Sequence, residues 1–231
     1  DDQNRFNNGW DATVSHSQEL DGELAGWLMS MALGSVSSAA TGSGYIHTCK
    51  PVPIATLTQP PSTTIVQKQT DETLYLKYSG MCVNECTISG KRGTGADSWI
   101  QSSHSMVGSG NVEDGTGVST PATTVTTPFL FSNIQTVTLN GVSVKDRLES
   151  FSFKHGNNLQ GDRGYLAGST LVSSAPVRQR LEYGDRRGSS VLEMTIERTR
   201  SASVLRTDFR AGTSQLVVIS CRGKLISGAT Y

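Results

Sequence analysis

The sequence has no excess of charge of either sign and no long apolar run. Its 20 Lys and Arg residues balance its 20 Asp and Glu residues, so the formal net charge is zero. Proteins that bind DNA through its phosphates usually have a cationic excess, so the composition argues against DNA binding of that kind. No stretch approaches the roughly 18 apolar residues that a membrane-spanning helix needs, and we expect no membrane partner.

Cysteine is sparse, with four residues in a chain of 231: Cys49, Cys82, Cys86 and Cys221. A disulfide framework belongs to short, cysteine-dense secreted domains, so we expect free, partly buried thiols. Cys82 and Cys86 are four residues apart and are expected to share one face of a strand. His47 lies near Cys49, but the spacing does not match a zinc motif. The sequence therefore predicts no metal site and no cofactor.

Catalytic motifs are also missing. The chain has no G-x-S-x-G turn, and its four histidines show no regular spacing to one another. The adjacent acidic pairs Asp71-Glu72 and Glu113-Asp114 are poor candidates for acid–base chemistry, because neighbours on a strand point to opposite faces. His47 is interpreted as a structural histidine. A β-rich hydrolase would need a triad that is not evident, so we expect no catalytic residues and no enzyme.

One segment, residues 17–33, has a strong helical pattern. We expect its N-terminal cap at Ser15 or Ser17 and its end at Gly34, where a left-handed conformation suits glycine. The apolar residues of this segment form one stripe along the helix: Leu20, Leu24, Trp27, Leu28 and Met31. The stripe predicts that this face of the helix is buried against the core.

The remaining regular structure is predicted to be β. The chain is organised around residues 75–88, which we expect to form two extended pieces that meet at Ser79-Gly80. Asn140-Gly141 predicts a tight hairpin turn, because both residues tolerate left-handed conformations. Residues 216–226 are nearly all apolar and are expected to form a buried strand. Further strands are predicted at 54–57, 63–69, 99–107, 135–139, 148–153 and 191–197.

Small and polar residues separate these segments. We expect loops at 35–44, 108–127 and 156–174, and a polar N-terminal arm over residues 1–15. Residues 16–231 are expected to form a single domain. The predicted fold is therefore mainly β: an antiparallel β-sandwich or barrel with one flanking N-terminal α-helix, an extended arm and long loops.

The segment 178–187 alternates in charge. It is either a solvated face or a set of charge pairs to another subunit, and the pattern leaves both readings open. Its charged residues are Arg178, Arg180, Glu182, Asp185, Arg186 and Arg187.

Several local motifs follow one another along nearly the whole chain. They are Ala32-Leu33-Gly34-Ser35-Val36, Tyr45-Ile46-His47-Thr48, Pro61-Ser62-Thr63-Thr64-Ile65, Tyr78-Ser79-Gly80-Met81-Cys82-Val83-Asn84-Glu85, and the segment 144–158 with Glu149-Ser150-Phe151-Ser152-Phe153 and Gly156-Asn157-Asn158. In their order and spacing, these motifs resemble the phage tail tube proteins.

The resemblance implies a structural subunit that forms hexameric rings, which stack into a hollow tube. In that family the inner sheets join across subunits into one continuous barrel, and DNA passes through its channel without specific binding. The implied partners are further copies of the chain and other tail proteins, such as the tape measure, tail terminator and distal tail components. The implied location is the virion tail, after assembly in the host bacterial cytoplasm.

The residues that the resemblance selects are interface residues. Phe6 and Trp10 in the arm are expected to anchor on a neighbouring subunit, as aromatic residues often do. The charged residues of 178–187 are expected to form charge pairs between subunits. Replacing Trp10 with Ala should impair tube assembly while leaving the fold of the monomer intact.

An alternative function from another class is an extracellular β-sandwich adhesin or carbohydrate-binding module. It would use Trp99, Tyr165 or Tyr183 as a platform on which a sugar stacks. Oligomer size separates the two functions, because a binding module should stay small and a tube subunit should form rings.

Overall fold

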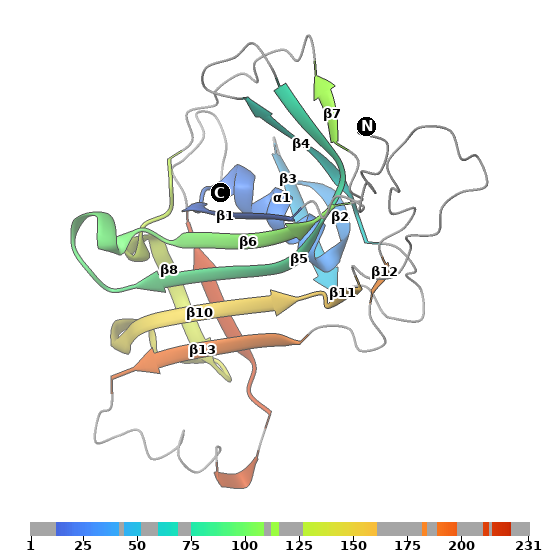
Figure 1. The fold of residues 1–231 in the computed structure, drawn as a ribbon. Helices are drawn as coiled ribbons and strands as arrows, with labels where there is room; N and C mark the ends of the chain where they lie inside the picture. The colour runs from blue at the N-terminus through green and yellow to red at the C-terminus, as the bar shows by residue number, and fades with distance from the viewer. Residues whose placement is uncertain are drawn as a thin grey trace, which may run out of the picture.

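The computed structural model describes residues 13–41, 44–51, 60–68, 75–108, 112–115, 127–160, 182–183, 189–197, 210–212 and 214–222. They form a mainly antiparallel β fold with a single α-helix, as the sequence predicts (Figure 1). In chain order the elements are β1 (Thr13–Glu19), α1 (Gly22–Leu33), β2 (Gly34–Thr41), β3 (Gly44–Pro51), β4 (Thr63–Lys68), β5 (Tyr75–Lys91), η1 (Gly95–Ser98), β6 (Gln101–Val107), β7 (Val112–Gly115), η2 (Phe131–Asn133), β8 (Ile134–Leu139), β9 (Val142–Ser143), η3 (Lys145–Arg147), β10 (Leu148–Gly156), β11 (Leu159–Gln160), β12 (Glu182–Tyr183), β13 (Ser190–Ile196) and β14 (Val217–Cys221).

β5 is the longest strand and holds the main sheet together. Its second half pairs with β6 on one side and β10 on the other, and its first half pairs with β7 and β4. The two pieces expected at Ser79-Gly80 are one continuous strand. Gly80 has a positive φ of 67°, which glycine adopts at little cost, so the strand bends there without ending (Figure 1).

The main sheet has the strand order β1-β6-β5-β10-β13, and every neighbouring pair is antiparallel. Behind it, β8 and β14 cross the front strands steeply and form a second sheet with β9 (Figure 1). The space between the two sheets is filled by a buried apolar cluster. Its fully or nearly fully buried members are Leu20, Ile100, Ile134, Val137, Leu139, Val144, Leu148 and Phe151.

Helix α1 covers another part of the same sheet face. Leu28 and Ala32 pack in a second cluster with Met81, Val83 and Met106 from the main sheet. The apolar stripe predicted from the sequence is therefore core. The predicted end is also confirmed, because Gly34 has φ 84° and its N–H bonds back to the carbonyl of Ser30.

The start of the helix was predicted too early. Asp21 is the N-cap, and its Oδ1 accepts a hydrogen bond of 2.7 Å from the N–H of Leu24. Residues 13–19, partly assigned to the arm and partly to the helix, form strand β1 instead. This segment is almost entirely polar, and only its pairing with β6 selects the extended conformation.

Three predicted loops contain strands. Residues 34–41 and 44–51 pair as β2 and β3, β7 lies within 108–127, and β11 within 156–174. Small residues such as Ser, Ala and Gly show no apolar alternation, so the pattern that identifies strands is absent there. The other predicted strands match β4, β6, β8, β10, β13 and β14, and residues 54–57 lie outside the described part of the chain.

Two further predictions are corrected and one is confirmed. β14 is not buried, because it is an edge strand of the second sheet. Val218 on the strand and Leu216 just before it are exposed. Cys82 and Cys86 lie on opposite faces, because the pairing of β5 with β6 shifts at Asn84 and forms a bulge. The Asn140-Gly141 turn has φ values of 47° and 80°, as a primed hairpin turn requires.

Candidate assembly interface

β13 is an open edge of the main sheet in the part of the chain that the structure describes. β10 pairs with one side of it, and no described strand pairs with the other. Its side chains Val191 and Leu192 are 43% and 36% exposed. An unpaired edge with exposed apolar side chains is a template for another strand, so β13 is a candidate for a contact with another chain through the main sheet.

The opposite edge, β1, has a different character. Its side chains are exposed on both faces except for the half-buried Val14. Serine, histidine, glutamine and glutamate make up most of the strand, whereas β13 is rich in apolar residues. Polar edges resist unwanted pairing, so β1 acts as a protected edge and β13 as an unprotected one.

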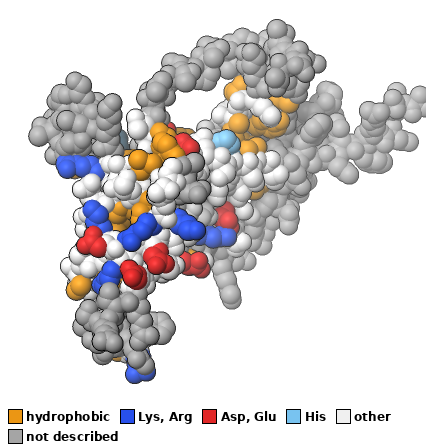
Figure 2. All heavy atoms as spheres, turned by 90° about the vertical axis from the view of Figure 1, so that its left-hand side faces the viewer, with side chains coloured by type: hydrophobic (Ala, Val, Ile, Leu, Met, Phe, Trp, Pro, Cys, Tyr) orange, Lys and Arg blue, Asp and Glu red, His pale blue; other side chains and the backbone are white. Residues whose placement is uncertain are grey.

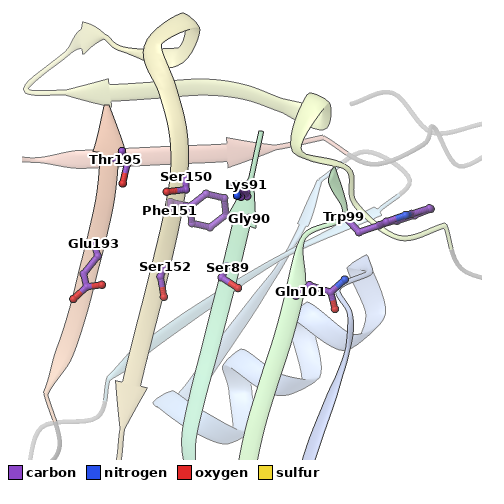
Figure 3. A pocket seen from close by; sticks show the side chains of 10 residues that line it. All are labelled: Ser89, Gly90, Lys91, Trp99, Gln101, Ser150, Phe151, Ser152, Glu193 and Thr195. Carbon is purple, nitrogen blue, oxygen red and sulfur yellow. The ribbon is translucent and has the colours of Figure 1, made fainter. Parts of the chain in front are cut away.

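One face of the main sheet is lined with small polar side chains and is not covered by the helix or by the second sheet. Register places them in rows across the strands, and Figure 3 shows two neighbouring rows. The first row contains Gln101, Ser89, Ser152 and Glu193, and the second contains Lys91, Ser150 and Thr195. Next along the sheet comes a row with Ser17, Ser103, Thr87 and Lys154, which ends at the apolar Val191 on β13. We call this surface the hydroxyl face.

The hydroxyl face has little net charge. Its charged residues are two lysines, Lys91 and Lys154, and three glutamates, Glu19, Glu85 and Glu193, which gives a net charge of −1. Lys154 Nζ lies 2.8 Å from Glu85 Oε2, and both side chains are about half exposed. A surface of this kind offers hydrogen bonds but no cluster of cations for phosphate.

Trp99 borders the hydroxyl face without forming a platform on it. It lines the same shallow hollow of about 330 Å³, but its ring points away from Ser89 and Gln101 (Figure 3). Tyr165 and the side chain of Tyr183 lie outside the described residues. Among the described residues, therefore, none of these three aromatic side chains forms the sugar-stacking platform that a carbohydrate-binding module would need.

The β2–β3 hairpin projects from the end of helix α1 with exposed side chains on both faces. Tyr45 is 70% exposed and stacks on His47, whose Nδ1 lies 2.8 Å from Ser38 Oγ. An isolated two-stranded hairpin is marginally stable in water, so this one is suited to a contact with another chain. The sequence reasoning missed it, although Gly42-Ser43 between two extended runs is a recognised hairpin signal.

Charged side chains gather where β5 and β13 end and β10 begins. Figure 2 looks onto this side of the molecule, where basic and acidic groups lie next to each other. Arg92 Nη2 donates a 2.6 Å hydrogen bond to the carbonyl of Asp146. A hollow of about 350 Å³ lies here, with Arg92 and Lys145 among its lining residues and Leu148 at its apolar base.

A buried polar network fixes the strands that carry these surfaces. Asn157 is fully buried, and its Nδ2 donates to the carbonyls of Ala32 and Val83 at 2.8 and 2.9 Å. Its Oδ1 therefore accepts from His155 Nε2 at 3.1 Å, which leaves His155 Nδ1 to accept from Ser190 Oγ at 2.7 Å. The network joins the helix end, β5, β10 and the first residue of β13.

The structure brings together histidines that the sequence did not relate. His16 and His104 are directly opposite on β1 and β6, with ring centroids 5.7 Å apart, and Trp27 lies edge-on to His104 at 5.9 Å. His104 is buried and its Nδ1 has no hydrogen-bond partner among the described residues. Burial, and secondarily the charge of His16, lowers the pKa of His104 below its usual value.

The cysteines are free thiols, as predicted. Burial raises the pKa values of Cys82 and Cys86 to about 11, and it also raises those of Cys49 and Cys221. Within the described residues, no group of three or more His, Cys, Asp or Glu side chains is arranged to hold a metal ion. No described helix is both long and apolar enough to cross a membrane.

The interface residues selected from the sequence fall outside this description. Phe6, Trp10, Arg178, Arg180, Asp185, Arg186 and Arg187 are not among the described residues. Glu182 is described only as backbone, in the pairing of β12 with β11. Their roles remain predictions.

The fold and these surfaces define a class: a β-structured assembly subunit whose main sheet has one protected and one unprotected edge, with an exposed hairpin and an uncovered polar sheet face. Comparison with protein families then identifies it. The chain belongs to the phage tail tube protein family, whose sequence model matches residues 11–231, nearly the whole chain. The protein is thus a structural subunit of a tail tube, in a family of structural proteins. A search of the curated proteins gives no significant match.

Proposed function

We propose that this protein assembles into hexameric rings that stack into the hollow conduit through which phage DNA passes into the host. The observation that carries the proposal is the open edge of β13, where Val191 and Leu192 are exposed on a strand that lacks a described partner on one side. In a closed ring of subunits, every such edge is paired by the next copy, which removes an aggregation-prone edge.

The hydroxyl face is proposed to line the channel. Its serines and threonines can hydrogen-bond to water, and its few charged groups of both signs give it no general attraction to phosphate. Contacts between cations and phosphates would hold the DNA and slow its passage. The opposite face of the sheet is covered by α1 and the second sheet, so it cannot serve this role.

Contacts between stacked rings are proposed to come from the ends of the subunit. The β2–β3 hairpin and the charged side shown in Figure 2 are exposed surfaces of this kind. The N-terminal arm with Phe6 and Trp10, and the charged segment 178–187, are proposed to add anchors and charge pairs. Tape measure, tail terminator and distal tail proteins are the proposed further partners, and assembly takes place in the host bacterial cytoplasm.

The test is negative-stain electron microscopy of the purified protein at rising concentration, with class averages to count subunits in each ring. The proposal expects rings with six-fold symmetry or hollow tubes. Leu192→Lys should abolish them, because a lysine on the open edge blocks pairing. Val218→Lys changes an apolar side chain of similar exposure on β14 and should leave assembly intact. Compact monomers at all concentrations, even with a tail initiation complex present, would contradict the proposal.

A further inference from the structure

The direction of the strands in the main sheet sets a condition on ring closure. All neighbouring pairs are antiparallel, so β1, β5 and β13 run one way and β6 and β10 run the other. Rotation about a ring axis keeps strand direction. If the described sheet entered the proposed ring unchanged, β13 of one copy would meet β1 of the next in the same direction. That junction would be the only parallel pairing in an otherwise antiparallel barrel.

Without β1 the mismatch disappears. The remaining order β6-β5-β10-β13 has β6 and β13 at its edges, and these strands run in opposite directions. Both are seven residues long, Gln101–Val107 and Ser190–Ile196, so they can pair over their full length. An antiparallel junction continues the pattern of the sheet, and purely antiparallel sheets are favoured over mixed ones of this kind.

β1 is held to the sheet mainly by its backbone ladder with β6 and buries little apolar surface. Half-buried Val14 is its main apolar contribution, and its side-chain contacts with β6 include the Ser17 Oγ bond to the carbonyl of Ser102 at 3.4 Å, the Ser102 Oγ bond to the carbonyl of Gln18 at 3.1 Å and the ring contact of His16 with His104. The firm attachment begins after the strand. Leu20 is buried, and its N–H donates to the carbonyl of Ile100 at 2.8 Å. The segment 13–19 can therefore leave β6 while Leu20 and helix α1 stay in place.

We propose that β1 is a removable cover for the edge of β6, and that β13 of a second copy replaces it when the ring closes. This inference rests on the proposed ring. The exchange replaces a ladder of seven register positions by one of the same length. In addition, the exchange buries Leu192 beside the β6 side chains that face the core, which favours the assembled state. Before assembly, the polar β1 keeps the edge of β6 from pairing with the wrong strand.

The test is an engineered disulfide bond that holds β1 on β6. Ser17 and Ser103 are directly opposite, so the double variant Ser17→Cys/Ser103→Cys places two thiols within disulfide distance. Ser89→Cys/Ser152→Cys is the matched control, because it joins β5 and β10 on the same hydroxyl face, where no exchange is proposed. Mass spectrometry verifies each bond, and circular dichroism verifies the fold.

The oxidised Ser17→Cys/Ser103→Cys variant should form no rings or tubes, and reduction of its disulfide bond should restore them. The control should assemble in both redox states. Tubes from the oxidised variant, as abundant as from its reduced form, would overturn this inference and leave the proposed function standing. A failure of the unmodified chain to form rings or tubes would overturn the proposed function, and the inference with it.

Discussion

Asn157 is expected to be the most sensitive polar position of the fold. Its side chain donates hydrogen bonds to two backbone carbonyls in irregular positions. Ala32 belongs to the last turn of α1, where carbonyls lose their helical donors, and Val83 stands at the bulge of β5. Asn157→Ala removes these two hydrogen bonds and the one from His155.

The expected cost follows from those three bonds. Each buried group left without a partner costs about 1–3 kcal/mol, so we expect Asn157→Ala to lower the free energy of unfolding by about 3–5 kcal/mol. Small domains have only about 5–15 kcal/mol in total. With a slope of about 2–3 kcal/mol per M for urea, the midpoint of unfolding should fall by about 1–2 M.

The assay is urea unfolding of the monomer, followed by circular dichroism. Asn158→Gly is the matched control, because Asn158 is the exposed neighbour and its φ of 48° is one that glycine adopts readily. It should change the free energy by less than about 1 kcal/mol. A loss as small as this for Asn157→Ala would refute the role of the network in joining α1, β5 and β10.

Three further predictions concern packing, pH and thiols. A Cβ on Gly90 would lie 2.8 Å from the Phe151 ring, so Gly90→Ala should lower the free energy of unfolding by about 1–3 kcal/mol. Gly26 lies on α1 with open space around it, so Gly26→Ala should raise the free energy of unfolding by about 1 kcal/mol. The midpoints of urea unfolding test both variants. Because the folded state lowers the pKa of His104, stability should fall as the pH drops below 6.5, and His104→Gln should flatten this dependence in midpoints measured from pH 7.5 to 5. The buried thiols of Cys82 and Cys86 have pKa values of about 11, so they should react with a thiol reagent at pH 8 only when the protein unfolds. Cys49 and Cys221 are more accessible and should react first. Equal reaction rates for all four cysteines would contradict this prediction.

The sequence by itself determined the class of fold and most of its strands. Apolar alternation, the helical stripe and the turn residues Asn140-Gly141 are local signals, and local conformational preference was enough to interpret them. The end of α1 at Gly34 is another case, because only glycine adopts the left-handed conformation there at little cost.

The tertiary structure decided what these elements do together. The polar segment 13–19 is extended only because β6 offers it a partner, and the bulge at Asn84, which separates Cys82 from Cys86, exists only in the pairing of two strands. Strand order likewise decides which edge is open and which face is uncovered. These properties depend on contacts between residues far apart in the chain, which no local pattern encodes.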